Sequence, residues 1–216
     1  LMSKVLKVTR GEVALNSERL MSDKDYRYFR KLISKRLRNM PIAYLTGKKS
    51  FWKYEFLIND KVLIPRPDSE LIIEQVLKIY KNKQNIKFLD VGVGSGAILL
   101  SILSEKKGFF GTGIDISKEC LNISKKNAIK LKVNERVKLY KSNIDNFNNG
   151  KYDLIISNPP YIKKLDLKNL DRDVRNFEPY IALNGGLDGL SEIRKLIKKS
   201  TELIKKNGKL ILEIAF

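Results

Sequence analysis

The sequence predicts an α/β protein in which helices cover both faces of a parallel β-sheet, preceded by a helical segment and a β-hairpin. From Ser69 onward, short apolar segments alternate with amphipathic segments of helical length, which is typical of a parallel sheet. The preceding stretch carries a turn signal and several aromatic residues, and the first forty residues show a helical pattern. We therefore expect a helical domain at 1–41, a hairpin linker at 42–66 and a main domain at 67–216.

The elements of the helical domain and of the linker are predicted from residues that cap helices or end helices and strands. Ser22 is placed to cap a helix that carries its apolar residues on one face and its charges on the other. Pro41 is expected to end this helix. In the linker, Gly47 signals a turn, and the apolar stretch Val62–Ile64 is expected to be a strand that stops at Pro65.

The main domain is expected to alternate helices and strands. The expected helices cover residues 69–81, 96–106, 117–130 and 189–205. The expected strands cover residues 88–91, 110–114, 137–140, 154–156 and 210–214. Because the last strand stops near the end of the sequence, where it would expose an unpaired sheet edge, we expect more chain beyond Phe216.

Composition restricts the functions open to this chain. Its 216 residues, 43% of them hydrophobic, allow a sizeable core. No apolar run approaches the ~20 residues of a membrane span. The sequence has no histidine, which excludes a histidine-ligated metal and a histidine general base. Cys120, the one cysteine, cannot form an internal disulfide or a zinc site alone. We expect a cytoplasmic protein with no metal and no membrane partner.

The formal net charge of +19 admits two interpretations. One is a polyanionic partner such as nucleic acid. The other is a lysine-rich composition without a specific partner. We favour the second, because lysines occur on nearly every predicted exposed face, and we do not expect direct nucleic-acid binding. The densest basic cluster lies on one predicted helix and can serve as a docking surface; its members are Lys24, Arg27, Arg30, Lys31, Lys35, Arg36 and Arg38.

A glycine-rich loop follows the strand expected at 88–91 and opens the next helix. It reads Asp90-Val91-Gly92-Val93-Gly94-Ser95-Gly96. Glycines permit a tight turn and let backbone N–H groups approach a ligand closely. Asp115 ends the following strand, where its carboxylate can accept both hydroxyls of a ribose. The loop and Asp115 therefore predict a nucleotide cofactor.

Two cofactor classes compete for this loop. A dinucleotide loop usually reads G-x-G-x-x-G and holds a pyrophosphate, whereas this one reads D-x-G-x-G-x-G. Asp90 would repel a pyrophosphate, but it can face a sulfonium or the ammonium of an amino acid, directly or through water. We therefore favour S-adenosyl-L-methionine. The alternative without a ligand is a turn that serves only helix–strand packing.

The tetrad Asn158-Pro159-Pro160-Tyr161 follows the fourth predicted strand, at the sheet edge where such folds bind ligands. Two consecutive prolines fix the backbone and remove two N–H donors. The side-chain oxygen of Asn158 and the carbonyl of Pro159 can each accept one N–H of a planar –NH₂ group, and Tyr161 can pack on that group. The tetrad thus predicts methylation of an amide or amino nitrogen, by aligning its lone pair and stabilising the charge that develops on it. The alternative is an ordinary rigid loop.

Five segments together resemble the protein-glutamine methyltransferases of peptide chain release factors. They are the glycine loop, the tetrad, and residues 41–47, 64–70 and 177–190. Asn-Pro-Pro-Tyr alone is shared with adenine-amino DNA methyltransferases, and the flanking segments separate the two families. The resemblance runs from about Pro41 to the end of the sequence, with a weaker helical match before it.

This resemblance implies a Rossmann-like class I methyltransferase fold. It implies methyl transfer to the glutamine amide of the Gly-Gly-Gln loop of a release factor, with the helical domain helping to bind that factor. The implied cofactor site comprises Gly92, Val93, Gly94, Ser95, Gly96, Asp115, Asn143, Ile144 and Asn158, the residues 143 and 144 lying near the adenine. The implied substrate site comprises Asn158, Pro159, Pro160 and Tyr161.

Some residues depart from the family pattern. Val93 stands where a threonine is common, and Asp68-Ser69 replaces the more usual Glu-Thr. Asn143 replaces a frequent aspartate, for which Asp145 can substitute. Both ends of the chain look short against the family, so we expect a fragment.

Two charged residues keep two interpretations each. Arg66 either contacts the substrate at its entrance or forms a salt bridge with Glu70. Glu178 either adds polarity to the pocket or braces a loop, and we favour the brace.

Two rival functions also remain. An adenine-amino nucleic-acid methyltransferase fits the tetrad and the charge but lacks a visible target-recognition domain, and an inactive basic binding module would not need the intact site.

Overall fold

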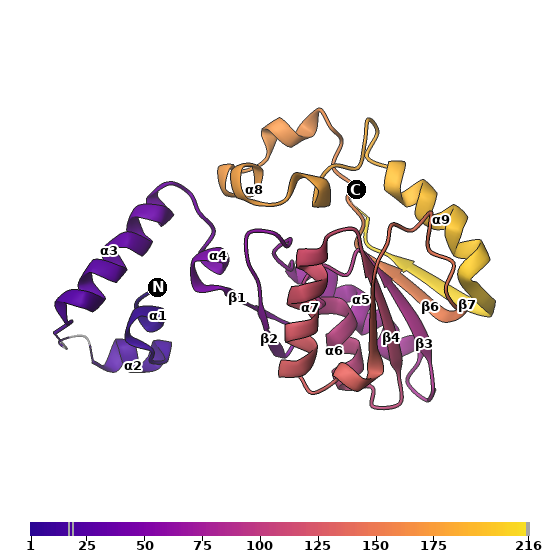
Figure 1. Cartoon of the computed structure of the whole chain (residues 1–216), viewed down its shortest axis with the longest axis horizontal. Helices are drawn as coiled ribbons and strands as arrows, with labels where there is room; N and C mark the ends of the chain where they lie inside the picture. Colours follow the sequence, from indigo (N-terminus) through magenta and orange to yellow (C-terminus); the bar gives the residue numbers. More distant parts are fainter. Residues whose placement is uncertain (17, 19, 215–216) are drawn as a thin grey trace.

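The computed structural model describes residues 1–16, 18 and 20–214. Figure 1 shows a group of N-terminal helices, a hairpin and a larger α/β domain. Within the described residues, the large domain is built on a five-stranded parallel sheet with helices on both faces. The predicted fold class is therefore confirmed. Among all the residues that the structure describes, no helix has the length and apolar character that a membrane span needs.

The N-terminal helices are α1 (Met2–Leu6), α2 (Arg10–Leu15) and α3 (Asp23–Leu37). Ser22 caps α3 as predicted, because its side-chain oxygen accepts the backbone N–H of Asp25. The prediction that Pro41 ends this helix was wrong. Helix α3 stops at Leu37, and Pro41 precedes the short helix α4 (Ile42–Thr46), which the sequence did not predict.

The hairpin pairs β1 (Lys48–Phe51) with β2 (Tyr54–Leu57) in antiparallel register. The strand expected at Val62–Ile64 is absent, since these residues form a loop. Val62 and Ile64 are nevertheless buried, in a cluster with Cys120 and Ile123 of the main domain. Their apolar character thus reflects burial and not strand pairing.

The helices and strands of the main domain start and end close to the predicted positions, apart from β7, which begins at Ile204. Residues 215–216 of the expected final segment lie outside the described residues. Helix α8 was not predicted. The helices are α5 (Glu70–Ile79), α6 (Ala97–Glu105), α7 (Lys118–Lys130), α8 (Arg172–Phe177) and α9 (Ser191–Leu203). The strands are β3 (Lys87–Val91), β4 (Phe110–Asp115), β5 (Val137–Lys141), β6 (Tyr152–Ser157) and β7 (Ile204–Leu212).

The order of strands across the sheet is β5-β4-β3-β6-β7, and all neighbours are parallel. The chain builds outward from β3 in one direction through β4 and β5, and then returns to add β6 and β7 on the other side. Open parallel sheets bind ligands at the carboxyl ends of the strands where this order reverses. That point lies between β3 and β6, the two strands that the glycine loop and the tetrad follow.

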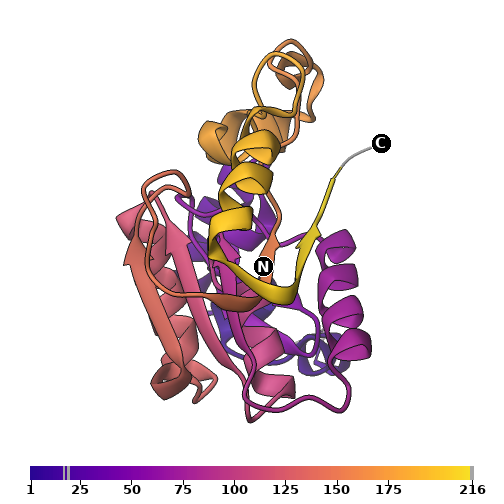
Figure 2. The same ribbon diagram turned by 90° about the vertical axis from the view of Figure 1, so that its right-hand side faces the viewer.

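Helices lie on both faces of the sheet, as Figures 1 and 2 show. Side chains of α5, α6 and α7 contribute to one hydrophobic core, and side chains of α9 contribute to the other. Successive strand residues point to opposite faces, so Phe88 enters the first core and Leu89 the second. Double burial accounts for the continuous apolar runs that made these strands predictable.

A single buried asparagine joins the hairpin to the glycine loop. Asn127 of α7 is fully buried. Its side-chain oxygen accepts the N–H of Leu57 at 2.7 Å, and its nitrogen donates to the carbonyls of Leu57 (2.9 Å) and Ser95 (2.8 Å). Buried backbone groups are costly when unpaired, so these three bonds hold the end of β2 against the loop.

We expect Asn127→Ala to lower the free energy of unfolding by roughly 2–4 kcal/mol, because it leaves three backbone groups without partners at about 1–3 kcal/mol each, with incomplete additivity. Urea denaturation measures this change. The matched control is Lys126→Ala, which changes the exposed neighbour on the same helix and should stay within about 0.5 kcal/mol of the parent. Equal stabilities for the two variants would contradict the role given to Asn127.

Candidate active site

Three segments identified from the sequence meet at one edge of the sheet. The glycine loop follows β3, Asp115 ends β4, and the tetrad follows β6. Val91 and Ser157 are register partners at the ends of β3 and β6. The hydroxyl of Ser157 also donates to the carbonyl of Val91 at 2.7 Å. This bond ties the starts of the two motifs together.

The glycine loop has the backbone that its sequence predicts. Gly92, Gly94 and Gly96 have φ values of 77°, 53° and 82°, a region that side chains disfavour. The N–H groups of Gly92 and Val93 both donate to the carbonyl of Ile114, at 2.9 and 3.0 Å. A Cβ built on Gly92 would meet nothing within 4 Å. The outer side of the loop therefore faces open space, as a backbone cradle for a ligand requires.

The remaining loop residues support this cradle from inside. The side chains of Val93 and Ser95 are buried, and the carbonyl of Ser95 accepts the amide of Asn127. A Cβ on Gly96 would lie 2.6 Å from Oγ of Ser124 and 2.7 Å from Cδ1 of Leu100. Gly96 thus allows the loop to pack closely against α6 and α7. This role differs from that of Gly92.

Two carboxyl groups lie behind the loop. Oδ2 of Asp115 accepts the N–H of Gly94, and Oδ1 accepts the N–H of Ser117, both at 2.9 Å. Each oxygen keeps capacity for a further hydrogen bond, such as one from a ribose hydroxyl. Asp90 is buried, and this burial, with a further contribution from the charge of Asp115, raises the pKa of its carboxyl to about 7. A cation placed beside Asp90 would favour its ionised form.

Asn143 and Ile144 follow β5 at the same edge of the sheet. Ile144 is buried in the second core. Asn143 is exposed, and its side-chain oxygen accepts the N–H of Asn146 at 2.9 Å. That oxygen can accept one more hydrogen bond. Contact of these residues with adenine stays a prediction.

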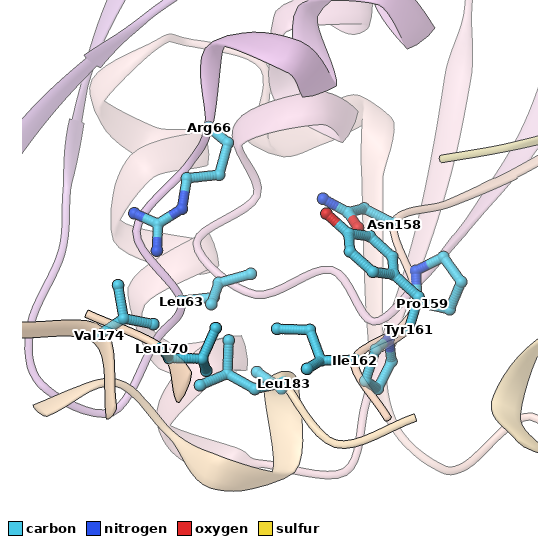
Figure 3. A pocket seen from close by; sticks show the side chains of 11 residues that line it. Leu63, Arg66, Asn158, Pro159, Tyr161, Ile162, Leu170, Val174 and Leu183 are labelled. Atoms are coloured by element: carbon cyan, nitrogen blue, oxygen red, sulfur yellow. The ribbon is translucent and has the colours of Figure 1, made fainter. Parts of the chain in front are cut away.

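A cavity of about 230 Å³ opens at the tetrad. Figure 3 shows Asn158 and Tyr161 close together, with Arg66 across from them. All four tetrad residues line the cavity. Its apolar walls come from separate segments, which explains why no sequence pattern indicated them; they are Leu63, Ile162, Leu170, Val174, Ala182 and Leu183.

Hydrogen bonds orient two tetrad side chains. Nδ2 of Asn158 donates to Oγ of Ser69 at 2.9 Å, and the oxygen of Asn158 accepts no hydrogen bond from the residues that the structure describes. The hydroxyl of Tyr161 donates to Oε1 of Glu213 at 3.3 Å. Burial, and then the charge of Glu213, raises the pKa of Tyr161, so the phenol stays neutral. No sequence pattern indicated a role for Ser69 or Glu213, because single polar residues produce no periodic signal.

A loop after α8 packs directly on the tetrad backbone. The N–H of Ile162 donates to the carbonyl of Leu183 at 3.1 Å, and the N–H of Gly185 donates back to Ile162 at 2.8 Å. A Cβ on Gly185 would lie 2.8 Å from the carbonyl oxygen of Pro160. Glycine is therefore needed for this close approach, which supports the rigid Pro-Pro turn.

Arg66 forms an ion pair with Glu178, so of its two interpretations the salt bridge to Glu70 was wrong. Glu70 instead accepts the N–H of Trp52 at 2.7 Å. Glu178 is buried, and its second oxygen accepts the N–H of Ile64 at 3.2 Å. The geometry matches the loop-brace interpretation of Glu178. A contact between Arg66 and a substrate stays a prediction.

Comparison with known proteins places this site in a family. The Methyltransferase small domain model matches residues 67–174, and the PrmC N-terminal domain model matches residues 1–47. The release factor glutamine methyltransferase of Caulobacter vibrioides is 36% identical over 210 residues, covering 97% of this chain and 73% of that protein. The one of Buchnera aphidicola subsp. Schizaphis graminum is 38% identical over 214 residues, covering 99% and 76%. The chain belongs to the release factor glutamine methyltransferase family.

The fold of this release factor glutamine methyltransferase family member is shared more widely. The crystal structure of ribosomal protein L11 methylase from Lactobacillus delbrueckii subsp. bulgaricus aligns with a TM-score of 0.50 and 18% identity, covering 71% of this chain and 63% of that chain. This likeness supports the class I methyltransferase fold alone. Family membership identifies the cofactor as S-adenosyl-L-methionine, as the glycine loop predicted. The open glycine cradle and the carboxylate of Asp115 are suited to hold it.

We expect the affinity for S-adenosyl-L-methionine to fall as the pH drops below 7. The reason is the predicted pairing of the cofactor's ammonium or sulfonium with ionised Asp90. The pKa of Asp90 in the free chain is about 7, so such pairing at lower pH requires loss of a proton. The loss approaches about tenfold per pH unit well below that pKa. Calorimetric titrations between pH 5.5 and 8.5 measure it.

Asp90→Asn isolates this carboxyl from Asp115, whose pKa burial also raises. The variant should bind more weakly at pH 8 and should lose most of the pH dependence. The same pH dependence in parent and variant would exclude Asp90 as the group responsible.

Proposed function

We propose that this chain transfers a methyl group from S-adenosyl-L-methionine to the side-chain amide nitrogen of the glutamine in the Gly-Gly-Gln loop of peptide chain release factors. One observation carries the proposal. The tetrad lines a cavity at the sheet edge beside the glycine loop, in a chain that matches release factor glutamine methyltransferases over nearly its whole length.

The cavity suits a glutamine side chain in two ways. Its apolar walls can pack against the methylene groups, while Asn158 and Pro159 offer oxygen acceptors at one side. An –NH₂ group has two hydrogens, and two acceptors bind both of them. Tyr161, held through its hydroxyl, can pack on the plane of the amide.

The chain contributes alignment and electrostatics to the reaction. An amide nitrogen is a poor nucleophile because its lone pair is delocalised. Holding both hydrogens directs that lone pair toward the methyl carbon, and the two oxygens stabilise the positive charge that develops on nitrogen. S-adenosyl-L-methionine, when bound, would supply the methyl group as an electrophile, and S-adenosyl-L-homocysteine would leave as the methyl carbon–sulfur bond breaks. The proton that the nitrogen then loses can pass to water, so no strong base is needed beforehand.

The N-terminal helices would contribute to binding of the release factor. The basic residues of α3 lie largely on its exposed side, while Leu32 and neighbouring apolar side chains pack toward α1 and α4. A basic surface attracts acidic partners and increases the rate of encounter. We propose that α3 contacts an acidic region of the release factor.

Radiolabelled S-adenosyl-L-methionine tests the proposed function. The chain is incubated with a release factor, with the same factor carrying alanine at the glutamine of its Gly-Gly-Gln loop, or with an adenine-containing DNA duplex. Label should enter the first substrate alone. Label in DNA alone would support the adenine methyltransferase instead, and label in no substrate would support an inactive binding module.

Asn158→Ala should lower the rate of methyl transfer by roughly 100-fold, as expected when a preorganised group that stabilises developing charge is removed. Some cofactor binding should remain, because Gly92 and Asp115 are unchanged. Single-turnover kinetics and calorimetry measure the two effects. Asn122→Ala, an exposed position on α7, is the control and should match the parent. An unchanged rate for Asn158→Ala would contradict its assigned role.

A further inference from the structure

The amide of Asn158 is held from outside the tetrad. Its nitrogen donates to the hydroxyl of Ser69, which lies 89 residues earlier in the chain. Ser69 is buried, with 3% of its surface exposed. It closes a short 3-10 turn, Pro67–Ser69, where its backbone N–H donates to the carbonyl of Arg66 at 3.1 Å. A buried hydroxyl in a hydrogen-bonded turn has little freedom to move.

The direction of the Asn158 amide matters for the proposed chemistry. An asparagine side chain has an acceptor oxygen on one side and a donor –NH₂ on the other, with nearly the same shape. If the group rotated by half a turn, two donors would face each other, the –NH₂ of Asn158 and the –NH₂ of the substrate. In the observed orientation the nitrogen of Asn158 donates to the hydroxyl of Ser69, and the oxygen of Asn158 is left to accept from a group in the cavity.

The segment that carries Ser69 is itself anchored. Pro65 and Pro67 restrict the backbone on both sides of Arg66. The side chain of Arg66 pairs with buried Glu178, which also accepts the N–H of Ile64. These contacts fix the turn against the wall of the cavity, so the hydroxyl of Ser69 has a defined position.

We infer that Ser69 is a positioning residue for methyl transfer: its buried hydroxyl anchors the side chain of Asn158 in place at the cavity. The inference rests on the proposed function and extends it to a residue outside the tetrad. Ser69 acts through Asn158, since its one side-chain hydrogen bond within the described residues goes to that amide.

The first test is the turnover number of Ser69→Ala with a release factor at saturating cofactor. We expect a fall of roughly five- to tenfold, the size set by one lost neutral hydrogen bond, with the dissociation constant for S-adenosyl-L-methionine within about twofold of the parent. Ser69→Thr keeps the hydroxyl and should retain most of the activity. The control is Ser200→Ala, because Ser200 is equally buried but its hydroxyl has no partner within the described residues; its rate should not change.

A second test separates positioning from general stability. In a chain that already carries Asn158→Ala, adding Ser69→Ala should change the rate less than about twofold, because the amide that Ser69 orients is gone. Independent, multiplying effects would overturn the inference. So would an unchanged rate for Ser69→Ala, or a weakened cofactor affinity with a normal rate at saturation. Each of these outcomes requires an active parent, whereas a parent that does not methylate a release factor would overturn the proposed function itself.

Discussion

The pairing of β3 with β6 is the contact on which the site depends. These strands are distant in the sequence, and their parallel register aligns Val91 with Ser157. The hydroxyl of Ser157 bonds to the carbonyl of Val91 and closes the pair at its carboxyl end. Beyond this point one strand continues into the glycine loop and the other into the tetrad. A cofactor on the first and a substrate on the second would therefore meet without any large movement of the chain.

The linker does more than join the N-terminal helices to the sheet. The end of β2 is held by Asn127, which also holds the carbonyl of Ser95 in the glycine loop. A few residues later, the Pro-Arg-Pro segment reaches the tetrad side through the bond from Asn158 to Ser69 and the ion pair of Arg66 with Glu178. One segment thus supports both halves of the site.

Much of the fold could be predicted because burial on both faces leaves a strong pattern. Phe88 and Leu89 are both fully buried, in opposite cores, and such runs indicate parallel strands. The glycine loop and the tetrad were visible because their backbones require unusual residues, glycine at positive φ and two consecutive prolines. The same use of apolar runs failed at Val62–Ile64. There the apolar pattern, which resembles that of a strand, results from burial against α7.

The contacts that complete the site had no comparable signal. The ion-pair partner of Arg66, Glu178, lies 112 residues away. The sequence suggested only a near neighbour, Glu70, as a partner. Ser69, Asn127 and Glu213 are single polar residues whose roles depend on tertiary contacts. Helix α3 ends before Pro41 because Asn39 takes a left-handed conformation, with a φ of 66°, and the N–H of Met40 donates to the carbonyl of Lys35 at 3.2 Å.

The proposed function depends on Asn158 and Pro159 holding a glutamine amide at this sheet edge. A crystal structure of the chain with S-adenosyl-L-homocysteine and a Gly-Gly-Gln peptide tests it most directly. We expect the amide nitrogen of glutamine within hydrogen-bond distance of Oδ1 of Asn158 and the carbonyl oxygen of Pro159, with its methylenes against the apolar walls of the cavity. A glutamine side chain bound outside this cavity, or held there by other groups, would contradict the account.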